Sequence, residues 1–238
     1  KSFWICCKLT RIFSFMELAT STILITGGSN GIGYYLTQYF SQIAQRVLVL
    51  DVDNTLTERL SSLTNVTGYV CDLTDPEAVE ATIKSVFEAH GSIQVCVNNA
   101  GIIHNETLVN LLKRPDRKHD LSSWKRVIDI NLNAVFYVTA NVVDSMIRTK
   151  QRGVIINISS IAAQGNVGQS AYAATKAAVE ALTKTWSKEL GMFKIRTACI
   201  APGFFDTPST RTHVNEHMLE KWQKMVPIQR LGELEEVA

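Results

Sequence analysis

The stretch at residues 23–40 reads ILITGGSNGIGYYLTQYF, and it decides the fold. Its apolar start predicts a buried strand, and a helix is predicted to begin near Tyr34. A strand, a glycine turn and a helix in this order are typical of a dinucleotide-binding loop. Glycines let a pyrophosphate approach the backbone, and the helix N-terminus offers free N–H groups. Gly27, Gly31 and Gly33 follow a Gly-x-x-x-Gly-x-Gly spacing, without the Gly-Lys-Ser/Thr ending of a P-loop.

A second apolar run, at residues 47–50, ends at Asp51. An acid about 20 residues beyond the glycine turn can accept hydrogen bonds from the adenosine ribose hydroxyls. It would also repel a 2′-phosphate. The glycine loop and the residues just after Asp51 contain no Lys or Arg, and Arg46 lies about 17 Å back along the strand. We therefore expect NAD as cofactor rather than NADP, with Asp53 as the alternative ribose ligand.

Tyr172 and Lys176 lie four residues apart at the start of an apolar-periodic run without proline. The run predicts a helix, on which positions i and i+4 share a face. An ammonium beside a phenol favours the phenolate, so we expect Lys176 to lower the pKa of Tyr172. Such a tyrosine can exchange a proton with an alcohol or a carbonyl near neutral pH.

Strand and helix patterns alternate along the rest of the chain. Further strands are predicted at 66–71, 93–97, 154–158 and 195–200, and further helices at 76–89, 122–149 and 172–191. This alternation predicts an α/β fold, a Rossmann-like doubly wound parallel sheet with helices on both faces. The length fits one dinucleotide-binding catalytic domain at 16–238. The motifs follow strands, so the site is expected at the carboxyl ends of the sheet.

From about Thr22 to the end, these motifs and their order resemble the short-chain dehydrogenase/reductase family, in particular its 3-oxoacyl reductase and 3-hydroxyacyl dehydrogenase members. The family pattern matches Thr26 with the three loop glycines, Asp72 after a strand, the run Asn98, Asn99, Ala100 and Gly101, the helix residue Asn131, a serine at 159–160, Tyr172 with Lys176, and Pro202, Gly203 and Thr207. The relatives continue with a further helix and a last strand, so we expect both to be missing here.

The resemblance implies the role of each residue. Tyr172 is the general acid/base, Lys176 lowers its pKa and holds the nicotinamide ribose, and Asn131 holds a water beside Lys176. The serine binds the substrate oxygen. We choose Ser160 because it directly precedes a small apolar segment, and we expect Ser159 to bond backbone at the strand end. The expected NAD-binding residues are Thr26, Gly27, Ser29, Asn30, Gly31, Ile32, Gly33, Asp51, Asp72, Leu73, Asn99, Ala100, Gly101, Tyr172, Lys176, Pro202, Gly203 and Thr207.

These roles imply an NAD-dependent oxidoreductase that interconverts a secondary alcohol and a ketone. The predicted substrate walls, at 104–120, 162–169 and 204–222, carry apolar side chains, so a hydrophobic substrate such as a 3-hydroxyacyl or 3-oxoacyl thioester fits. The basic segment 108–120 is either a solvated loop or a docking patch for an acidic carrier or coenzyme phosphates. The alternative function is a non-catalytic NAD-binding regulatory or scaffold protein, and the four intact catalytic residues argue against it. Sugar-nucleotide epimerases share the Tyr-x-x-x-Lys pair, but their glycine spacing usually differs.

Composition sets further limits. A net charge of +2 does not indicate nucleic-acid binding. The five cysteines do not suggest a disulfide framework, which favours a reducing, cytoplasmic compartment. No Cys or His spacing suggests a metal site, and the histidines are expected at the surface. Residues 1–15 could mimic a targeting peptide, but their apolar runs are too short to span a bilayer. We expect them to be an extension outside the fold, and the resemblance implies a homo-oligomer, a tetramer or a dimer.

Overall fold

A six-stranded parallel sheet forms the centre of the molecule. The computed structural model describes residues 17–113, 115–206 and 216–237. The strand order is β3-β2-β1-β4-β5-β6, and every pairing is parallel. The strands are β1 Thr22–Thr26, β2 Arg46–Asp51, β3 Val66–Val70, β4 Val95–Asn98, β5 Gly153–Ile158 and β6 Ile195–Ile200. The predicted doubly wound fold is confirmed. The order reverses between β1 and β4, and such a switch point is where ligands bind.

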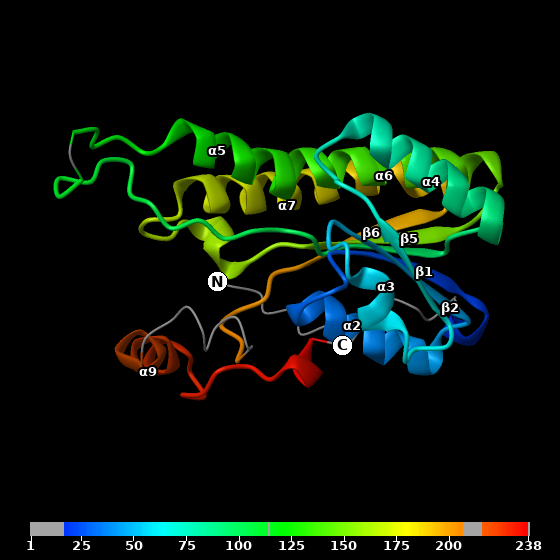
Figure 1. Ribbon diagram of the computed structural model, residues 1–238, viewed down its shortest axis with the longest axis horizontal. Helices are drawn as coiled ribbons and strands as arrows, with labels where there is room; N and C mark the ends of the chain where they lie inside the picture. Colours follow the sequence, from blue (N-terminus) through cyan, green and yellow to red (C-terminus); the bar gives the residue numbers. More distant parts are fainter. Residues whose placement is uncertain (1–16, 114, 207–215, 238) are drawn as a thin grey trace.

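Helices cover both faces of this sheet (Figure 1). One face carries α4 Pro76–His90, α5 Leu121–Ile128, α6 Ala134–Arg148 and α7 Ser170–Leu190, and the other carries α2 Gly31–Ile43 and α3 Leu56–Leu60. Shorter elements are the 3₁₀ turns η1 Leu18–Thr20, η3 Ile161–Gln164, η4 Gly191–Phe193 and η5 Leu234–Glu236, and the helix α9 Glu216–Met225. Across the described ranges, none of the helices has both the length and the apolar character that a membrane crossing requires.

The core has two halves, one on each face of the sheet. Alternate residues of each central strand enter different clusters: Leu24 packs with the α4, α6 and α7 side, whereas Ile23 and Ile25 pack with the α2 side. All five residues of β1 are buried. A strand that is buried on both faces reads as a continuous apolar run, which is why the sequence reveals it.

The long helix predicted at 122–149 is interrupted. Between α5 and α6 the chain forms one π-helical turn, η2, at Asp129–Asn133. Such a turn inserts a residue into the helix and is frequent at functional sites. The apolar periodicity gave no sign of it, because the flanking helices continue in nearly the same direction (Figure 1).

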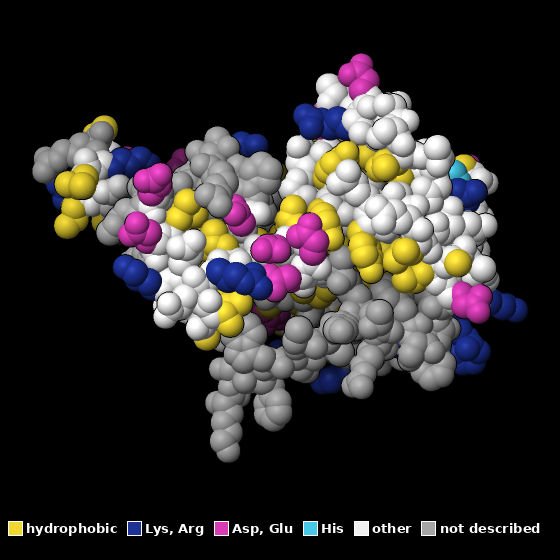
Figure 2. Space-filling view, turned by 90° about the horizontal axis from the view of Figure 1, so that it is seen from below, with side chains coloured by type: hydrophobic (Ala, Val, Ile, Leu, Met, Phe, Trp, Pro, Cys, Tyr) yellow, Lys and Arg dark blue, Asp and Glu magenta, His cyan; other side chains and the backbone are white. Residues whose placement is uncertain are grey.

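The C-terminal residues lie on the α2 face. Val237 is buried against the cluster that contains Leu36 and Phe40, and Arg230 pairs with Glu236 at 2.8 Å. Figure 2 shows this side of the molecule: acidic side chains gather beside basic ones near its middle, and hydrophobic side chains lie in separate groups around them. Val237, directly after the 3₁₀ turn η5, therefore helps to cover α2.

Candidate active site

The glycine loop lies at the C-terminal end of β1 and packs too closely for side chains. A Cβ at Gly33 would lie 2.0 Å from the carbonyl oxygen of Gly27, and one at Gly27 would meet the Ala100 backbone at 2.8 Å. Gly31 has a φ of +55° and open space in front of it. The N-cap residue of α2, Asn30, makes no capping side-chain hydrogen bond. The first turn of α2 thus keeps N–H groups for an anion, as a pyrophosphate requires.

Two residues predicted to bind the cofactor, Thr26 and Asn99, hold this loop in place. The Thr26 hydroxyl accepts hydrogen bonds from the backbone N–H groups of Asn99 and Ala100, both at 3.1 Å. The Asn99 side-chain amide donates to the carbonyl oxygens of Thr26 and Gly27. These bonds join the ends of β1 and β4, so Thr26 and Asn99 position the loop whatever it binds.

Asp51 lies at the end of β2, beside the glycine loop. Its carboxylate accepts hydrogen bonds from Ser29 N at 2.9 Å and from Asp53 N at 3.1 Å. The expectation that no cation lies nearby was too simple. Arg59 of α3 pairs with Asp53 at 2.8 Å and reaches the Asn30 side chain at 3.4 Å. The sequence near Asp51 does not show Arg59, because the fold brings α3 to the glycine loop.

Tyr172 and Lys176 share one face of α7, as predicted. The Lys176 Nζ lies 5.6 Å from the centre of the Tyr172 ring. It donates a hydrogen bond of 2.8 Å to the carbonyl oxygen of Ile158, the last residue of β5. Lys176 is 5 % exposed. The ammonium is therefore fixed by the backbone at the end of the sheet.

The expected lowering of the Tyr172 pKa is wrong for this structure. Burial raises the pKa of Tyr172, and a hydrogen bond with Ser160 opposes that shift only in part. Burial also lowers the pKa of Lys176 to about 8. Desolvation disfavours both charged forms, and it outweighs the attraction that the helix spacing suggested.

The two adjacent serines have separate surroundings. The Ser160 side chain accepts a hydrogen bond from Ala162 N at 3.1 Å and lies near enough to the Tyr172 phenol to lower its pKa. Ser159 is buried, and its hydroxyl lies 2.9 Å from a Glu180 carboxylate oxygen and 3.2 Å from the Lys176 carbonyl oxygen. Ser159 thus bonds backbone on α7, and Ser160 faces Tyr172.

Asn131 lies in the π turn and is completely buried. Its side chain accepts from Ile102 N at 2.8 Å and donates to Ile102 O at 2.9 Å. A Cβ at Gly101 would lie 3.3 Å from Asn131 Oδ1 and 3.5 Å from Lys176 Nζ. Asn131 and Lys176 therefore converge beside Gly101, and the π turn aims the amide at the segment after β4.

The remaining predicted residues lie after other strands of the sheet. Asp72 lies after β3, and its hydrogen bonds with Thr74 lower its pKa. Leu73 is buried, and Pro202 follows β6 and accepts a hydrogen bond from Ile161 N at 3.1 Å. Gly203 is exposed. Thr207 lies outside the described residues.

A buried polar chain behind the site escaped sequence reasoning. The Asn98 amide donates to Thr139 Oγ1 and to Asn157 Oδ1, and the Asn157 amide donates to Thr183 Oγ1, each at 2.8 Å. These bonds join β4 and β5 to α6 and α7. Asn98 and Asn157 are paired residues of neighbouring strands, and a polar residue near the end of each apolar run was the signal available.

Comparison with known proteins agrees with this geometry. A protein-family model described as short chain dehydrogenase matches residues 21–218. The chain belongs to the short-chain dehydrogenase family. A 3-oxoacyl-[acyl-carrier-protein] reductase FabG of Thermotoga maritima is 39 % identical over 232 residues, covering 94 % of this chain and 89 % of the relative. A sorbitol-6-phosphate 2-dehydrogenase of Klebsiella pneumoniae is 32 % identical, over 92 % of this chain and 82 % of its own length. The crystal structure of gox2181 superposes with a TM-score of 0.84 at 28 % identity, covering 93 % of this chain and 86 % of that one.

Membership makes this short-chain dehydrogenase an oxidoreductase with a nicotinamide cofactor and a small-molecule substrate. The residues present fit such a cofactor: the glycine loop has no room for side chains, and the α2 N-terminus has no side-chain cap. Asp51 is the last residue of β2, and Asp72 lies just beyond the end of the neighbouring parallel strand β3.

Two of the predicted substrate walls meet in the structure. Glu106 N donates to Gly168 O at 2.7 Å, and Gln169 Nε2 donates to Asn105 Oδ1 at 2.9 Å. They border an open cavity of about 680 Å³ lined by residues that include His104, Glu106, Lys113 and Val167. On the third wall, Phe204 stacks on Trp222 with ring centroids 4.6 Å apart.

Proposed function

We propose that this chain is an NAD(H)-dependent oxidoreductase that interconverts a secondary alcohol and a ketone. The observation that carries the proposal is the buried Lys176, whose Nζ lies 5.6 Å from the centre of the Tyr172 ring, with Ser160 near enough to the phenol to lower its pKa. A phenol and a hydroxyl that meet in this way can both bond one substrate oxygen. Asn131 and Lys176 converge on the same side, next to Gly101.

Each residue has a role that its contacts support. The bound cofactor supplies or accepts the hydride at the substrate carbon. In reduction, the Tyr172 hydroxyl gives its proton to the substrate oxygen, and in oxidation the phenolate takes that proton back. Ser160 donates a hydrogen bond to the same oxygen and holds it in place. The Lys176 ammonium, fixed on Ile158 O, stabilises the phenolate when it forms.

The preference for NAD rests on Asp51, whose carboxylate faces the glycine loop. A 2′-phosphate would place further negative charge beside it. Arg59 is the cation that could offset this repulsion, and the Asp53 carboxylate at 2.8 Å already balances its charge. We therefore assign NAD.

A test of this assignment compares kcat/KM for NAD and NADP in wild type, Asp51→Ala and Asp53→Ala. We expect NAD to be preferred by wild type. Asp51→Ala should reduce the difference in kcat/KM between NAD and NADP, because it removes the carboxylate that repels the 2′-phosphate. Asp53→Ala should also reduce this difference, because it frees the Arg59 guanidinium from its ion pair. Arg59→Ala is the matched control, which should not favour NADP. Equal values for the two cofactors in wild type would refute the assignment.

For the substrate we propose a hydrophobic ketone or secondary alcohol, such as a 3-oxoacyl or 3-hydroxyacyl thioester. The Phe204–Trp222 stack and the exposed Val167 offer apolar surface for an acyl chain. The basic residues Lys113, Arg117 and Lys118 are exposed and Lys113 lines the cavity, which suits an acidic carrier. We also propose that the protein acts as a homo-oligomer, which light scattering would test.

The deciding experiment follows the absorbance of reduced nicotinamide with the purified protein. The substrate panel contains 3-oxoacyl thioesters, simple ketones and polyol phosphates, each with both cofactors. We expect turnover with a 3-oxoacyl thioester, and none with Tyr172→Phe. Cofactor binding by fluorescence without turnover of any substrate would favour a non-catalytic NAD-binding protein instead.

A further inference from the structure

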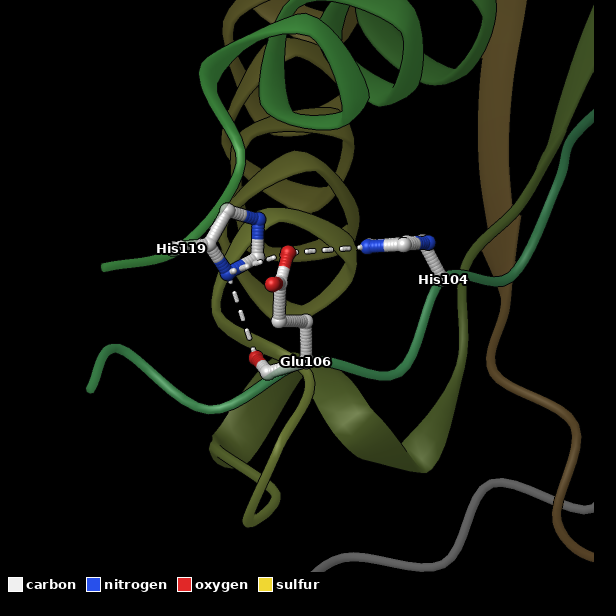
Figure 3. A group of neighbouring side chains, drawn as sticks. All are labelled: His104, Glu106 and His119. Carbon is white, nitrogen blue, oxygen red and sulfur yellow. Dashed lines mark hydrogen bonds and ion pairs between the residues drawn. The ribbon is translucent and has the colours of Figure 1, made fainter. Parts of the chain in front are cut away.

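Three side chains in the segment between β4 and α5 meet at one point that the proposed chemistry does not use. They are His104, Glu106 and His119, and Figure 3 shows both rings directed at the Glu106 carboxylate from opposite sides. The carboxylate Oε2 lies 3.3 Å from His104 Nε2 and 3.7 Å from His119 Nδ1. One ligand atom from each residue lies within 4.8 Å of the others. The expectation of surface histidines is wrong for His119, which is 8 % exposed.

The spacing suits a tetrahedral ion. Zinc binds imidazole nitrogen and carboxylate oxygen at about 2.0–2.2 Å, which puts tetrahedral ligand atoms roughly 3.3–3.5 Å apart. The 3.3 Å separation between Glu106 Oε2 and His104 Nε2 matches that value. Two imidazoles and one carboxylate form a donor set of the kind that zinc and neighbouring transition metals prefer over calcium or magnesium.

The carboxylate is already oriented by its surroundings. Lys113 Nζ donates to Oε1 at 2.6 Å, and Asp120 N donates to Oε2 at 2.9 Å. These hydrogen bonds, with one from His104, lower the pKa of Glu106 to about 2. The group is therefore an anion at any working pH. Carboxylates that bind metals are generally held by outer hydrogen bonds from neutral donors, such as the one from Asp120 N.

A second observation points to a missing partner. His119 Nε2 is, among the described residues, a buried side-chain nitrogen without a hydrogen-bond partner. The other ring nitrogen, Nδ1, lies 3.2 Å from the carbonyl oxygen of Glu106. A histidine that donates one ring N–H to a carbonyl leaves its other nitrogen as a lone pair, the form that binds metal. A buried lone pair without a partner is otherwise unfavourable.

We propose that His104, Glu106 and His119 bind one divalent transition ion of the zinc class. Water from the adjoining cavity, which His104 and Glu106 line, completes the coordination. The ion links His104 and His119, which lie at the two ends of one loop. Closing this loop reduces the conformational entropy that is lost when the loop becomes ordered, so the ion stabilises the substrate wall that contacts Gly168.

Lys113 gives the proposal a sharp control. Its ammonium neutralises part of the carboxylate charge and repels a cation, and its side chain is 44 % exposed, so it can move away. A purely hydrogen-bonded cluster would lose a support when Lys113 is removed. A metal site would lose a competing charge instead.

The test uses the full chain without an affinity tag of histidines, treated with a chelator that is then removed. Zn²⁺ binding is measured by calorimetry, and Co²⁺ binding by the visible absorption of tetrahedral cobalt. We expect one ion per chain, a cobalt band of tetrahedral intensity, and a rise in Tm that grows with ion concentration. Absence of binding at micromolar ion would overturn the proposal.

Single variants locate the ion. His104→Ala and Glu106→Gln should each weaken binding by at least about 10-fold. His90→Ala, which removes a histidine bonded to Tyr69 outside the cluster, should leave binding unchanged. Lys113→Met should strengthen it. His104 is chosen over the buried His119 because its side chain is 33 % exposed and its loss should not prevent folding.

Circular dichroism without metal checks that each variant folds. Binding that survives both His104→Ala and Glu106→Gln would place the ion elsewhere and overturn the proposal. Weaker binding in Lys113→Met would do the same. All of these readouts are independent of turnover, so the metal site and the proposed oxidoreductase activity fail separately.

Discussion

Helix α7 and the segment 102–120 both contribute to the candidate active site, but they are held in different ways. On α7, Tyr172 and Lys176 are fixed by helical spacing and by a bond to the end of β5. Where the structure describes the segment 102–120, its regular pairing is limited to isolated bridges, such as Val109 with Lys118, and it depends on the Glu106 carboxylate. The geometry of a site on regular elements is determined by the local sequence, whereas the geometry of a site on a loop depends on contacts between side chains that are far apart in the sequence.

The largest effect is expected at the centre of the α7 side. Tyr172→Phe keeps the ring and removes only the hydroxyl that exchanges a proton. We expect kcat to fall by about 10²–10⁴-fold, with cofactor affinity nearly unchanged. Steady-state kinetics and cofactor titration measure the two quantities. A near-wild-type kcat would show that Tyr172 is not the acid/base.

The glycine loop should tolerate an added side chain less well than glycine positions elsewhere in the backbone. A Cβ at residue 33 would collide with the Gly27 carbonyl, so Gly33→Ala should destabilise the fold by about 1–3 kcal/mol or more and weaken cofactor binding. Gly191→Ala is the matched control, since nothing lies within 4 Å of its added Cβ. Chemical denaturation of both variants decides. Equal stabilities would mean that the loop can shift to make room.

The lowered pKa of Lys176 should make the free energy of unfolding depend on pH. Its pKa is 10.5 in the unfolded chain and about 8 in the folded one. Between these values the unfolded chain holds the proton that the folded chain has lost, so its contribution to stability rises with pH. Compared with Lys176→Met, wild type should gain on the order of 2–3 kcal/mol across that window. A difference that stays flat from pH 8 to pH 10.5 would contradict the lowered pKa of Lys176.

The smallest effect on the whole molecule is expected from the loop side. Glu106→Gln weakens the bonds that the carboxylate accepts from Lys113 and His104, so the segment 102–120 should exchange its amide hydrogens faster. The global Tm should change little, and amides on α7 should stay protected. Hydrogen exchange read by mass spectrometry measures both regions in one sample. Equal loss of protection on α7 would show that the two regions unfold together.

The sequence predicted the parts of the molecule that depend on neighbours along the chain. Apolar runs such as β1 revealed the strands, because both faces of a parallel sheet are buried. The glycine loop and the Tyr172–Lys176 pair could be predicted from the sequence, because a turn and a helix place residues a few positions apart in a fixed geometry. The π turn at Asn131 was not, since one extra residue in a helix hardly disturbs its apolar pattern.

Other features arose only when distant segments came together. Arg59 reaches Asn30 across 29 positions, and His104 meets His119 through a loop whose charged residues look solvated in sequence. The pKa of Tyr172 likewise follows from burial, which no local spacing reports. The sequence thus determined the fold, and it brought together the residues of the proposed catalytic set, through local geometry. The tertiary structure decided which charges face one another and how far each lies from water, because electrostatic energies depend on distance and burial in space.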